Sequence, residues 1–374
     1  MTKLGILGGG QLARMIIEEN SRYGFEFHIL SKEHCSPSGQ LTPHEIVGDW
    51  NDKNIVKNFA DKCDILTLEN EFIDFNILEL LEKSGKVILP GSNIIRLIQD
   101  KLYQKNTLSE AGIPVAEYCE VNSADEVKRF AEEYGYPVIL KSRTMGYDGK
   151  GNYKVSNESE IELACDVLLK RGKLMCEKFV SFEKEIAVQA VRSSNGEMKV
   201  YPVVETIQEN HICKYVIASG GRFSEHNKTV NEICEKILAS MSYAGVMGIE
   251  MFLCGNEILV NELAPRVHNS GHYTIEGCST SQFENHIRAI LGLPLGNSEM
   301  KVPSAVMINI LGERNGPADI KGMERTLACT DTYLHLYGKR ETRIGRKMGH
   351  ITVVGNDVDT LMKKADDARK TVEI

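Results

Sequence analysis

Two glutamates, Glu250 and Glu262, lie in a stretch that the sequence predicts to be a β-hairpin. Cys254-Gly255-Asn256 is a turn signal between two apolar runs. If the turn centres on Gly255-Asn256 and one residue is bulged, Glu250 lies directly opposite Glu262, and both side chains point to the same face. Like charges at this spacing destabilise a sheet unless a cation lies between them. Two interpretations of this stretch therefore stay open: a Mg²⁺–nucleotide site, and two unrelated solvent-facing carboxylates.

A basic loop follows the predicted hairpin directly. It contains Arg266 and His268 among Asn, Ser and Gly residues, and a second basic segment near the C-terminus contains Lys339 and Arg346. Arginine can clamp an anion through two parallel hydrogen bonds, and histidine is a titratable donor. These segments predict recognition of a phosphorylated substrate, and a solvated basic turn is the alternative for each of them alone.

A lysine at a predicted strand end, Lys141, precedes a glycine-rich loop that runs from Thr144 to Gly151. A loop of this composition can fold its amides over phosphates. It is not a Walker A loop, because no Gly-Lys-Ser/Thr sequence opens a helix there. The alternative is a flexible hairpin tip with a surface lysine. The downstream pair Glu250 and Glu262 weakens this alternative, because a nucleotide's metal would be needed there.

The segment Gly8-Gly-Gly-Gln-Leu-Ala13 fits the G-x-G-x-x-G/A pattern between a strand and a helix. A helix N-terminus with small residues suits a phosphate. A dinucleotide site also needs an acid at the tip of the second strand, which Ser31-Lys-Glu33 supplies only ambiguously. A phosphate site, an NAD site and simple helix–strand packing all remain open.

The composition is that of a globular protein: 42% of the 374 residues are hydrophobic and 26% are charged. The net charge is −8 and no Lys/Arg block is present, so we expect no nucleic-acid partner. We also expect no membrane span and no signal peptide. The ten cysteines show no metal-binding spacing, which indicates reduced thiols and a cytoplasmic protein.

The order of elements predicts three domains. Strands alternate with helices up to about residue 99, which indicates a doubly wound parallel sheet. A small α+β unit spans about 110–180 and carries the glycine-rich loop at its lip. Antiparallel strands are expected at Ile186–Arg192 and Lys199–Val204, and further strands and a closing helix follow Pro294. The predicted domains are 1–99, 100–294 and 295–374.

The order of lysine, glycine-rich loop, linker and two-glutamate hairpin resembles the ATP-grasp superfamily. Within it, three segments together resemble the 5-(carboxyamino)imidazole ribonucleotide synthases of purine biosynthesis: Gly146-Tyr-Asp-Gly-Lys-Gly151, Asn261-Glu-Leu-Ala-Pro-Arg-Val-His-Asn-Ser-Gly-His272 and Gly345-Arg-Lys-Met-Gly-His350. The resemblance covers essentially the whole chain. Ala264 stands where many ATP-grasp relatives have a metal-binding Asn, which also favours this narrower family.

The resemblance implies an α/β and α+β, three-domain ATP-grasp architecture whose N-terminal domain is Rossmann-like and precedes the ATP-grasp domain. It implies Mg²⁺ held by Glu250 and Glu262, and catalytic roles for Asp148, Arg266 and His268, with Asp148 accepting the amine proton. Residues implied for ATP are Lys101, Lys141, Met145, Gly146, Tyr147, Asp148, Gly149, Lys150, Gly151, Glu177, Lys178, Phe179, Val180, Glu185, Gln208, Asn261 and Glu262. Residues implied for the ribonucleotide are Glu71, Tyr147, Asp148, Arg266, His268, Lys339 and Arg346.

Three positions depart from the family's pattern. In the family the glycine-rich loop forms a lid over ATP. Met145 replaces the usual first glycine of this lid, which should stiffen the lid slightly. Gln208 stands where a histidine is common, and Leu68-Glu-Asn-Glu71-Phe is a variant of the usual Glu-Phe-Glu pattern. These departures bear on the nucleotide contact of Gln208 and on the assignment of Glu71.

The implied reaction is the carboxylation of the amine of 5-aminoimidazole ribonucleotide by bicarbonate and ATP through carboxyphosphate. The implied partners are these three small molecules, and a homodimer is expected. The alternatives are another ATP-grasp carboxylase such as biotin carboxylase, a formate-using purine transformylase, an NAD-dependent oxidoreductase, and a nucleotide sensor without turnover.

Overall fold

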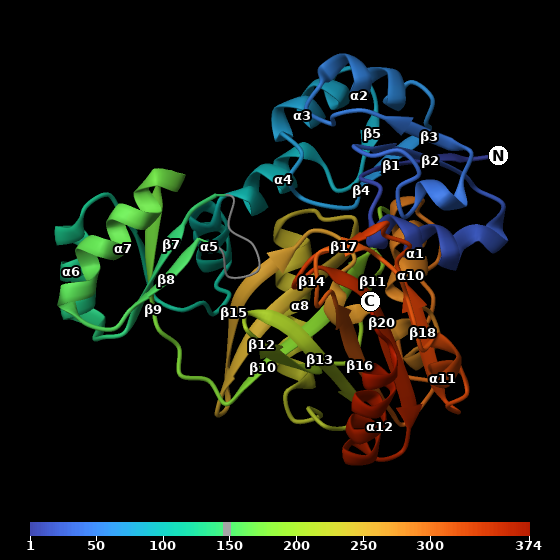
Figure 1. The fold of residues 1–374 in the computed structure, drawn as a ribbon. Coiled ribbons are helices and arrows are strands. Elements are labelled where there is room, and N and C mark those ends of the chain that lie inside the picture. Colours follow the sequence, from blue (N-terminus) through green and yellow to red (C-terminus); the bar gives the residue numbers. More distant parts are fainter. Residues whose placement is uncertain (145–150) are drawn as a thin grey trace.

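The computed structural model describes residues 1–144 and 151–374. Three units surround the chain's predicted site: an N-terminal α/β unit, a small four-stranded unit, and a large unit built on a nine-stranded sheet. Figure 1 shows the N-terminal unit (blue) and the small unit (green) on different sides of the large sheet, with helices α4 and α5 between them. None of the helices in the described residues is long and apolar enough to span a membrane.

The N-terminal unit is a parallel, doubly wound sheet, as predicted. Its strands lie in the order β3-β2-β1-β4-β5, and the inner strands β1 and β4 are almost entirely buried because helices cover the sheet. The strands are β1 (Lys3–Leu7), β2 (Glu26–Ser31), β3 (His44–Val47), β4 (Ile65–Leu68) and β5 (Val87–Ile88). The helices are α1 (Gln11–Asn20), α2 (Lys53–Ala60), α3 (Phe75–Lys83) and α4 (Ser92–Gln99).

The small unit is an antiparallel sheet with two helices packed on it in one apolar cluster. Its strand order is β6-β9-β7-β8, and helix α5 (Lys101–Glu110) leads into it. The remaining elements are β6 (Tyr118–Val121), α6 (Ala124–Tyr134), β7 (Val138–Ser142), β8 (Asn152–Val155), α7 (Ile161–Leu168) and β9 (Leu174–Lys178). Lys141 therefore lies near the end of β7, as predicted, and the glycine-rich segment begins in the sequence two residues after this strand ends.

The large sheet has the order β15-β14-β10-β12-β13-β16-β20-β18, with β11 paired to β10. The C-terminal strands β16, β18 and β20 continue this sheet, so it runs across the predicted boundary between residues 294 and 295. Its strands are β10 (Lys184–Arg192), β11 (Met198–Val200), β12 (Val204–Glu209), β13 (Ile212–Ser219), β14 (Gly245–Cys254), β15 (Glu257–Ala264), β16 (Ser304–Leu311), β18 (Thr332–Leu336) and β20 (Lys347–Gly355).

Helices hold the units together. Ala13 and Ile16 of α1 share one buried cluster with Phe283 and Ile287 of α10, so the N-terminal unit is packed firmly against the large unit. The other elements are α8 (Asn227–Ser240), α9 (Thr274–Gly277), α10 (Gln282–Ile290), α11 (Met323–Leu327), α12 (Val358–Thr371) and the short pair β17 (Gly316–Pro317) and β19 (Glu341–Thr342).

The predicted strand Lys199–Val204 was wrong as a single element. The structure divides it into β11, which ends at Val200, and β12, which begins at Val204. Pro202 lies between them and has no amide to donate to a ladder. The two strands then pair with different parts of β10.

Candidate active site

The hairpin β14–β15 has the register that the sequence predicted. Glu250 pairs with Glu262 and Met251 pairs with Val260, so Asn261 is the additional, bulged residue. The turn is closed at Gly255, whose φ is +63°, a conformation that favours glycine. Glu250 and Glu262 therefore lie side by side on one face of the sheet, and Asn261 lies next to them.

The electrostatics of Glu250 favour a bound cation. Burial, the facing Glu262 and the nearby Glu185 raise the pKa of Glu250 to about 7. A cation between Glu250 and Glu262 would remove the repulsion that opposes ionisation. Carboxylate oxygens are the ligands that Mg²⁺ prefers, and one or two of them are its usual protein contribution. The donor set therefore fits Mg²⁺.

Helix α5 directs two lysines at the same region. Asp100 caps the helix by accepting from the amides of Leu102 and Tyr103, and this fixes Lys101 in the first turn. The Lys101 Nζ lies 2.7 Å from Oε1 of Glu262. Lys105, one turn further on, is 3% exposed and donates to the Val260 carbonyl at 3.3 Å. Burial lowers the pKa of Lys105.

Strands β7 and β9 supply the third lysine and its partner. Ile139 is opposite Glu177, so Lys141 and Glu177 are diagonal neighbours on one face, and Lys141 Nζ donates to Oε2 of Glu177 at 2.6 Å. Lys105 Nζ lies 3.5 Å from the other carboxylate oxygen. Burial would raise the pKa of Glu177, but attraction to Lys141 and Lys105 outweighs it and lowers the pKa.

Lys105 is a candidate that sequence reasoning left without a role. It lies four residues after Lys101, so both project from the same face of α5. That spacing was the available signal, but only the structure shows that Glu177 holds Lys105 next to Lys141. The ammonium groups of Lys101, Lys105 and Lys141 face the β14–β15 hairpin, and we call this group of three the lysine wall.

The predicted adenine and ribose positions lie at the end of β9 and on β10 and β12. The Glu177 carboxylate is engaged by lysines, whereas Phe179 and Val180 follow β9 and are partly exposed. The side chain of Gln208 donates to Glu185, whose pKa is raised by burial. The structure thus brings Glu185 and Gln208 together, and their contacts with a nucleotide remain predictions.

Arg266 and Glu71 form a bidentate pair that joins the hairpin loop to the N-terminal unit. The Nε and Nη2 atoms of Arg266 donate to the two Glu71 oxygens at 2.5 and 2.9 Å. Burial would raise the pKa of Glu71, but the Arg266 guanidinium lowers it. The variant segment around Glu71 therefore still places this carboxylate at the site.

His268 lies on the other side of the same loop. Its Nε2 is 3.6 Å from Oε1 of Glu250. Burial, Arg266 and Lys347 lower the pKa of His268 well below its usual value, so the ring is neutral. Gly248 of β14 makes room for it, because a Cβ there would lie 2.6 Å from the Cβ of His268.

The C-terminal cations lie in the connections between strands: Lys339 is in the connection between β18 and β19, and Arg346 directly precedes β20. Lys339 Nζ donates to the Lys347 carbonyl at 2.6 Å, and Arg346 Nη1 donates to the Glu341 carbonyl at 2.7 Å. Burial and the neighbouring Arg346 lower the pKa of Lys339 to about 8. Lys347, in the motif but not assigned beforehand, is close enough to influence the pKa of Glu250 and His268.

The glycine-rich N-terminus of α1 is occupied by a carboxylate of the chain itself. Gly10 N donates to Oε2 of Glu69 at 2.6 Å and Leu12 N donates to Oε1 at 3.1 Å. A Cβ at Gly10 would lie 2.2 Å from that carboxylate, so glycine is required there. Glu69 thus takes the position that a dinucleotide pyrophosphate would need, which disfavours the NAD alternative.

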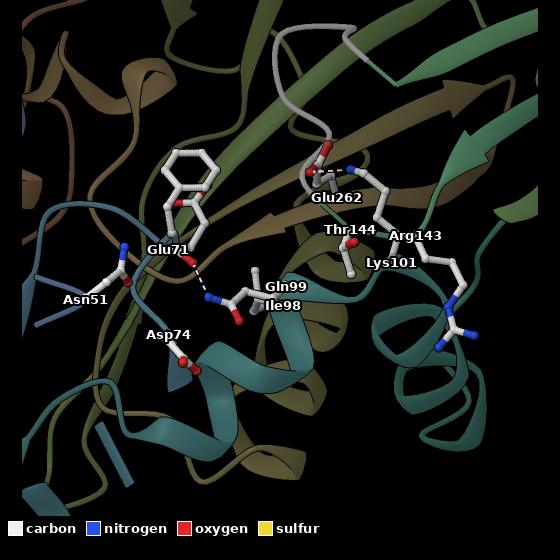
Figure 2. Close-up of a pocket in the computed structure, with 10 residues that line it drawn as sticks. Asn51, Glu71, Asp74, Ile98, Gln99, Lys101, Arg143, Thr144 and Glu262 are labelled. Atoms are coloured by element: carbon white, nitrogen blue, oxygen red, sulfur yellow. Dashed lines mark hydrogen bonds and ion pairs between the residues drawn. The ribbon is translucent and has the colours of Figure 1, made fainter. Parts of the chain in front are cut away.

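A pocket of about 250 Å³ connects the N-terminal unit to the β14–β15 hairpin. Figure 2 shows Lys101 and Glu262 on one side of it and Glu71, Asn51 and Asp74 on the other, with Gln99 between them. Gln99 Nε2 donates to the carbonyls of Glu71 and Ile73, both at 2.7 Å. The lining residues are Asn51, Glu71, Phe72, Asp74, Ile98, Gln99, Lys101, Arg143, Thr144 and Glu262.

Part of the predicted site lies outside the described residues. This applies to the predictions for Met145, Gly146, Tyr147, Asp148, Gly149 and Lys150. Gly151 is described and buried, and its carbonyl accepts from Ser142 N at 2.8 Å. The loop's last predicted residue is therefore anchored to the end of β7.

Three protein families match successive parts of the chain. Residues 1–99 match the ribonucleotide synthetase preATP-grasp domain, residues 106–283 match the ATP-grasp domain, and residues 305–364 match the phosphoribosylaminoimidazole carboxylase C-terminal domain. The phosphoribosylaminoimidazole carboxylase of Ogataea methanolica is 44% identical over 366 residues, which are 95% of this chain and 67% of that protein. The chain spans about two thirds of the length of such carboxylases, between 63 and 67%.

Shorter relatives match over nearly their whole length. The N5-carboxyaminoimidazole ribonucleotide synthase of Bacillus subtilis is 37% identical over 358 residues, 95% of this chain and 92% of that protein. A crystal structure of N5-carboxyaminoimidazole synthase from Aspergillus clavatus, in complex with ADP and 5-aminoimidazole ribonucleotide, superposes with a TM-score of 0.90 at 36% identity. The match covers 99% of this chain and 98% of the crystallised chain. The predicted resemblance is confirmed: the chain belongs to the N5-carboxyaminoimidazole ribonucleotide synthase family of ATP-grasp ligases.

Proposed function

We propose that the chain uses ATP and bicarbonate to carboxylate the exocyclic amine of 5-aminoimidazole ribonucleotide. The products would be N5-carboxyaminoimidazole ribonucleotide, ADP and phosphate. Family membership supports this proposal, as does the relative that was crystallised with ADP and 5-aminoimidazole ribonucleotide. The single observation that carries it is the Glu250–Glu262 pair facing the lysine wall, an arrangement suited to a metal-bound triphosphate.

The triphosphate would lie between the small unit and the metal hairpin. Mg²⁺ held by Glu250 and Glu262, with Asn261 beside them, would neutralise charge on the transferred phosphoryl group. Lys101 and Lys141 would contact the phosphates, and Lys105 would hold Glu177 in place between the lysines. Prearranged cations of this kind stabilise the charge that develops in the transition state.

The reaction proceeds in two steps. An oxygen of bicarbonate attacks the γ-phosphorus, the bond to the ADP oxygen breaks, and carboxyphosphate forms. The amine nitrogen then forms a bond to the carboxyl carbon, directly or after release of CO₂ within the site, and phosphate leaves. Asp148, which lies outside the described residues, is proposed to accept the amine proton. Because water hydrolyses carboxyphosphate, closure of the site over the reactants is needed.

The ribonucleotide would bind between the hairpin loop and the C-terminal strands. Arg266 and Glu71 are held together by a bidentate ion pair, Glu71 lines the pocket, and Lys339 and Arg346 lie in the connections on either side of β19. Their side chains present cations from two parts of the chain, as a phosphorylated substrate requires. This convergence would explain why a separate C-terminal domain is present.

The decisive experiment measures ADP release from ATP and bicarbonate, with and without 5-aminoimidazole ribonucleotide. Transfer of ¹³C from labelled bicarbonate to the ribonucleotide, followed by NMR, identifies the product. ADP release that depends on the ribonucleotide and matches ¹³C incorporation supports the proposal. Transfer from formate instead of bicarbonate would indicate the transformylase alternative, and ATP binding without turnover would indicate a sensor.

The quaternary state and location are proposed separately. We propose a homodimer, which multi-angle light scattering at micromolar concentration tests directly. All ten cysteines lie in the described part of the chain and are free. This is consistent with the proposed cytoplasmic location, where thiols stay reduced.

A further inference from the structure

The short loop after the metal hairpin fixes which nitrogen of His268 carries the proton. His268 caps the 3₁₀ turn Asn269–Gly271, and its side chain accepts from the backbone amide of Ser270. The Ser270 N lies 3.4 Å from Nδ1, and the Ser270 Oγ lies 2.8 Å from the same nitrogen. An amide N–H can only donate, so Nδ1 must be an acceptor without a proton.

Gln189, a fully buried residue on β10, determines the direction of the Ser270 hydroxyl. Gln189 Nε2 donates to Ser270 Oγ at 2.7 Å. The hydroxyl therefore accepts from Gln189, and its own hydrogen is directed to Nδ1 of His268. Gly271 permits this approach, because a Cβ there would lie 2.7 Å from the Gln189 side-chain carbon.

The backbone of His268 is held just as firmly. Gln282 accepts from His268 N at 2.9 Å and donates to the His268 carbonyl at 2.7 Å. The ring can therefore change neither its position nor its proton without breaking a buried network. In a neutral imidazole with an unprotonated Nδ1, the proton is on Nε2.

The Nε2–H group faces the reaction site. It lies 3.6 Å from Oε1 of Glu250, too far for a hydrogen bond, and no described residue accepts from it at bonding distance. The donor is partly exposed, since 18% of the His268 side chain is accessible. It is positioned to donate to an oxygen of a molecule that binds beside Glu250.

We infer that Ser270 and Gln189 are positioning residues that hold His268 in its Nε2–H form, so that His268 donates a hydrogen bond to a substrate oxygen and does not act as a base. The inference rests on the proposed function for the identity of that substrate. The oxygen belongs either to the bicarbonate-derived group or to the ribonucleotide, and kinetics can distinguish these sources.

The kinetic test compares Ser270→Ala with Ser304→Ala. Ser304 is an equally buried serine on β16, and its hydroxyl contacts Ser219 and not the site. Ser270→Ala should lower kcat/KM about fivefold for the substrate that accepts the hydrogen bond, because a hydrogen bond contributes about 1 kcal/mol. The KM for ATP should stay unchanged. Ser304→Ala should change neither this KM nor kcat/KM for bicarbonate or for the ribonucleotide.

A loss restricted to bicarbonate identifies the bicarbonate-derived group as acceptor, and a loss restricted to the ribonucleotide identifies that substrate. Either result supports the inference. Unchanged kinetics, or a loss restricted to ATP, would overturn it. A second pair of variants separates donor from base: His268→Gln can place an amide N–H near the Nε2 position, whereas His268→Asn cannot reach it. Greater activity in His268→Gln supports a donor, and equal inactivity of the two contradicts it.

The tautomer itself is observed by long-range ¹H–¹⁵N NMR of histidine-labelled protein, with the His268 signals assigned by their loss in His268→Gln. We expect the Nε2–H pattern in the wild type and a mixture of tautomers in Ser270→Ala and Gln189→Leu. An Nδ1–H pattern in the wild type would overturn the inference. If the wild type forms no carboxylated product, the proposed function fails, whereas the NMR result still decides the tautomer.

Discussion

Glu177 and Glu250 are two glutamates of one site, and their surroundings shift their pKa values in opposite directions. Glu177 lies on β9 of the small unit between Lys141 and Lys105, and its pKa is lowered although burial opposes this. Glu250 lies on β14 of the large sheet, where burial and the nearby carboxylates Glu262 and Glu185 raise its pKa to about 7. Burial acts against ionisation at both positions, so the neighbouring charges make the difference.

The difference separates a structural carboxylate from one that needs a ligand. The charge of Glu177 is balanced by the chain's own lysines, which it holds in position. The charge of Glu250 is opposed by neighbouring carboxylates and becomes favourable only when a cation arrives. The carboxylate of Glu177 is charge-balanced by lysines, whereas the carboxylate of Glu250 is not. The site is therefore suited to a cation that binds together with phosphate.

Replacing Glu250 with glutamine should have the largest effect. We expect Glu250→Gln to lower turnover by orders of magnitude, because the proposed Mg²⁺ ligand is lost. The free energy of unfolding of the apoprotein should not fall, since the substitution removes a repulsion. Steady-state kinetics at saturating Mg²⁺ and chemical denaturation measure the two effects. Glu257→Gln, on the exposed start of β15, is the control and should retain full activity. Near-normal turnover in Glu250→Gln would contradict the proposal that Glu250 binds the metal.

Glu177→Gln should show the opposite pattern in stability. Removing one partner of a buried ion pair leaves the other uncompensated, so we expect a loss of about 3–5 kcal/mol in the free energy of unfolding. Glu158→Gln, which breaks the exposed pair with Lys128 in the same unit, should lose less than about 1 kcal/mol. Denaturant titrations at neutral pH compare the two variants. Equal losses would contradict the structural role of Glu177.

Arg346→Ala extends the comparison to the ribonucleotide end. A charge-assisted hydrogen bond contributes about 1.5–3 kcal/mol, so the KM for the ribonucleotide should rise at least about tenfold. The KM for ATP should hardly change, because the triphosphate is proposed to lie at the lysine wall. Arg343→Ala, an exposed arginine in the same segment, is the control. Weaker ATP binding with unchanged ribonucleotide dependence would mean that the two ligands have been assigned to the wrong ends.

The smallest effect is a change in the pH dependence of stability. The pKa of Glu250 is higher in the folded protein than in the unfolded chain, so this part of the stability falls as pH rises from about 4.3 to 7. The lowered pKa of Glu177 has the opposite sign: its contribution is present above about pH 4.3 and is lost as pH falls through the folded pKa. Glu250→Gln should remove the first slope and Glu177→Gln the second. The first slope is modest because 36% of the Glu250 side chain is exposed.

The parts of the site that depend on local geometry could be predicted from the sequence. The Gly255 turn fixes the register of the hairpin, and the register places Glu250 opposite Glu262. The contacts of Glu177 and Glu69 could not be predicted, because their partners lie 36 and 59 residues away and are brought together only by the folded sheets. The glycine pattern near Gly10 was consistent with a phosphate site, and Glu69 fills that position instead.

The fold, too, could be predicted from the sequence only where it depends on local patterns. The alternating pattern of the first 99 residues predicted the parallel sheet, because crossover helices follow β1, β3 and β4. Strand β13 and helix α4 were missed, and the continuity of β13 with β16 follows from pairing between distant segments. No local pattern in the C-terminal segment indicates that its strands extend the sheet of another domain.

That continuous sheet has a consequence for how the chain folds as it is synthesised. Strand β13 receives its second neighbour only when residues 304–311 are available, and β16 only when residues 347–355 are available. Until then the growing sheet has an open edge with unpaired amides and carbonyls, which other chains can join. Chains that end before residue 347 should therefore aggregate, even though the β14–β15 hairpin and all three lysines have already been made.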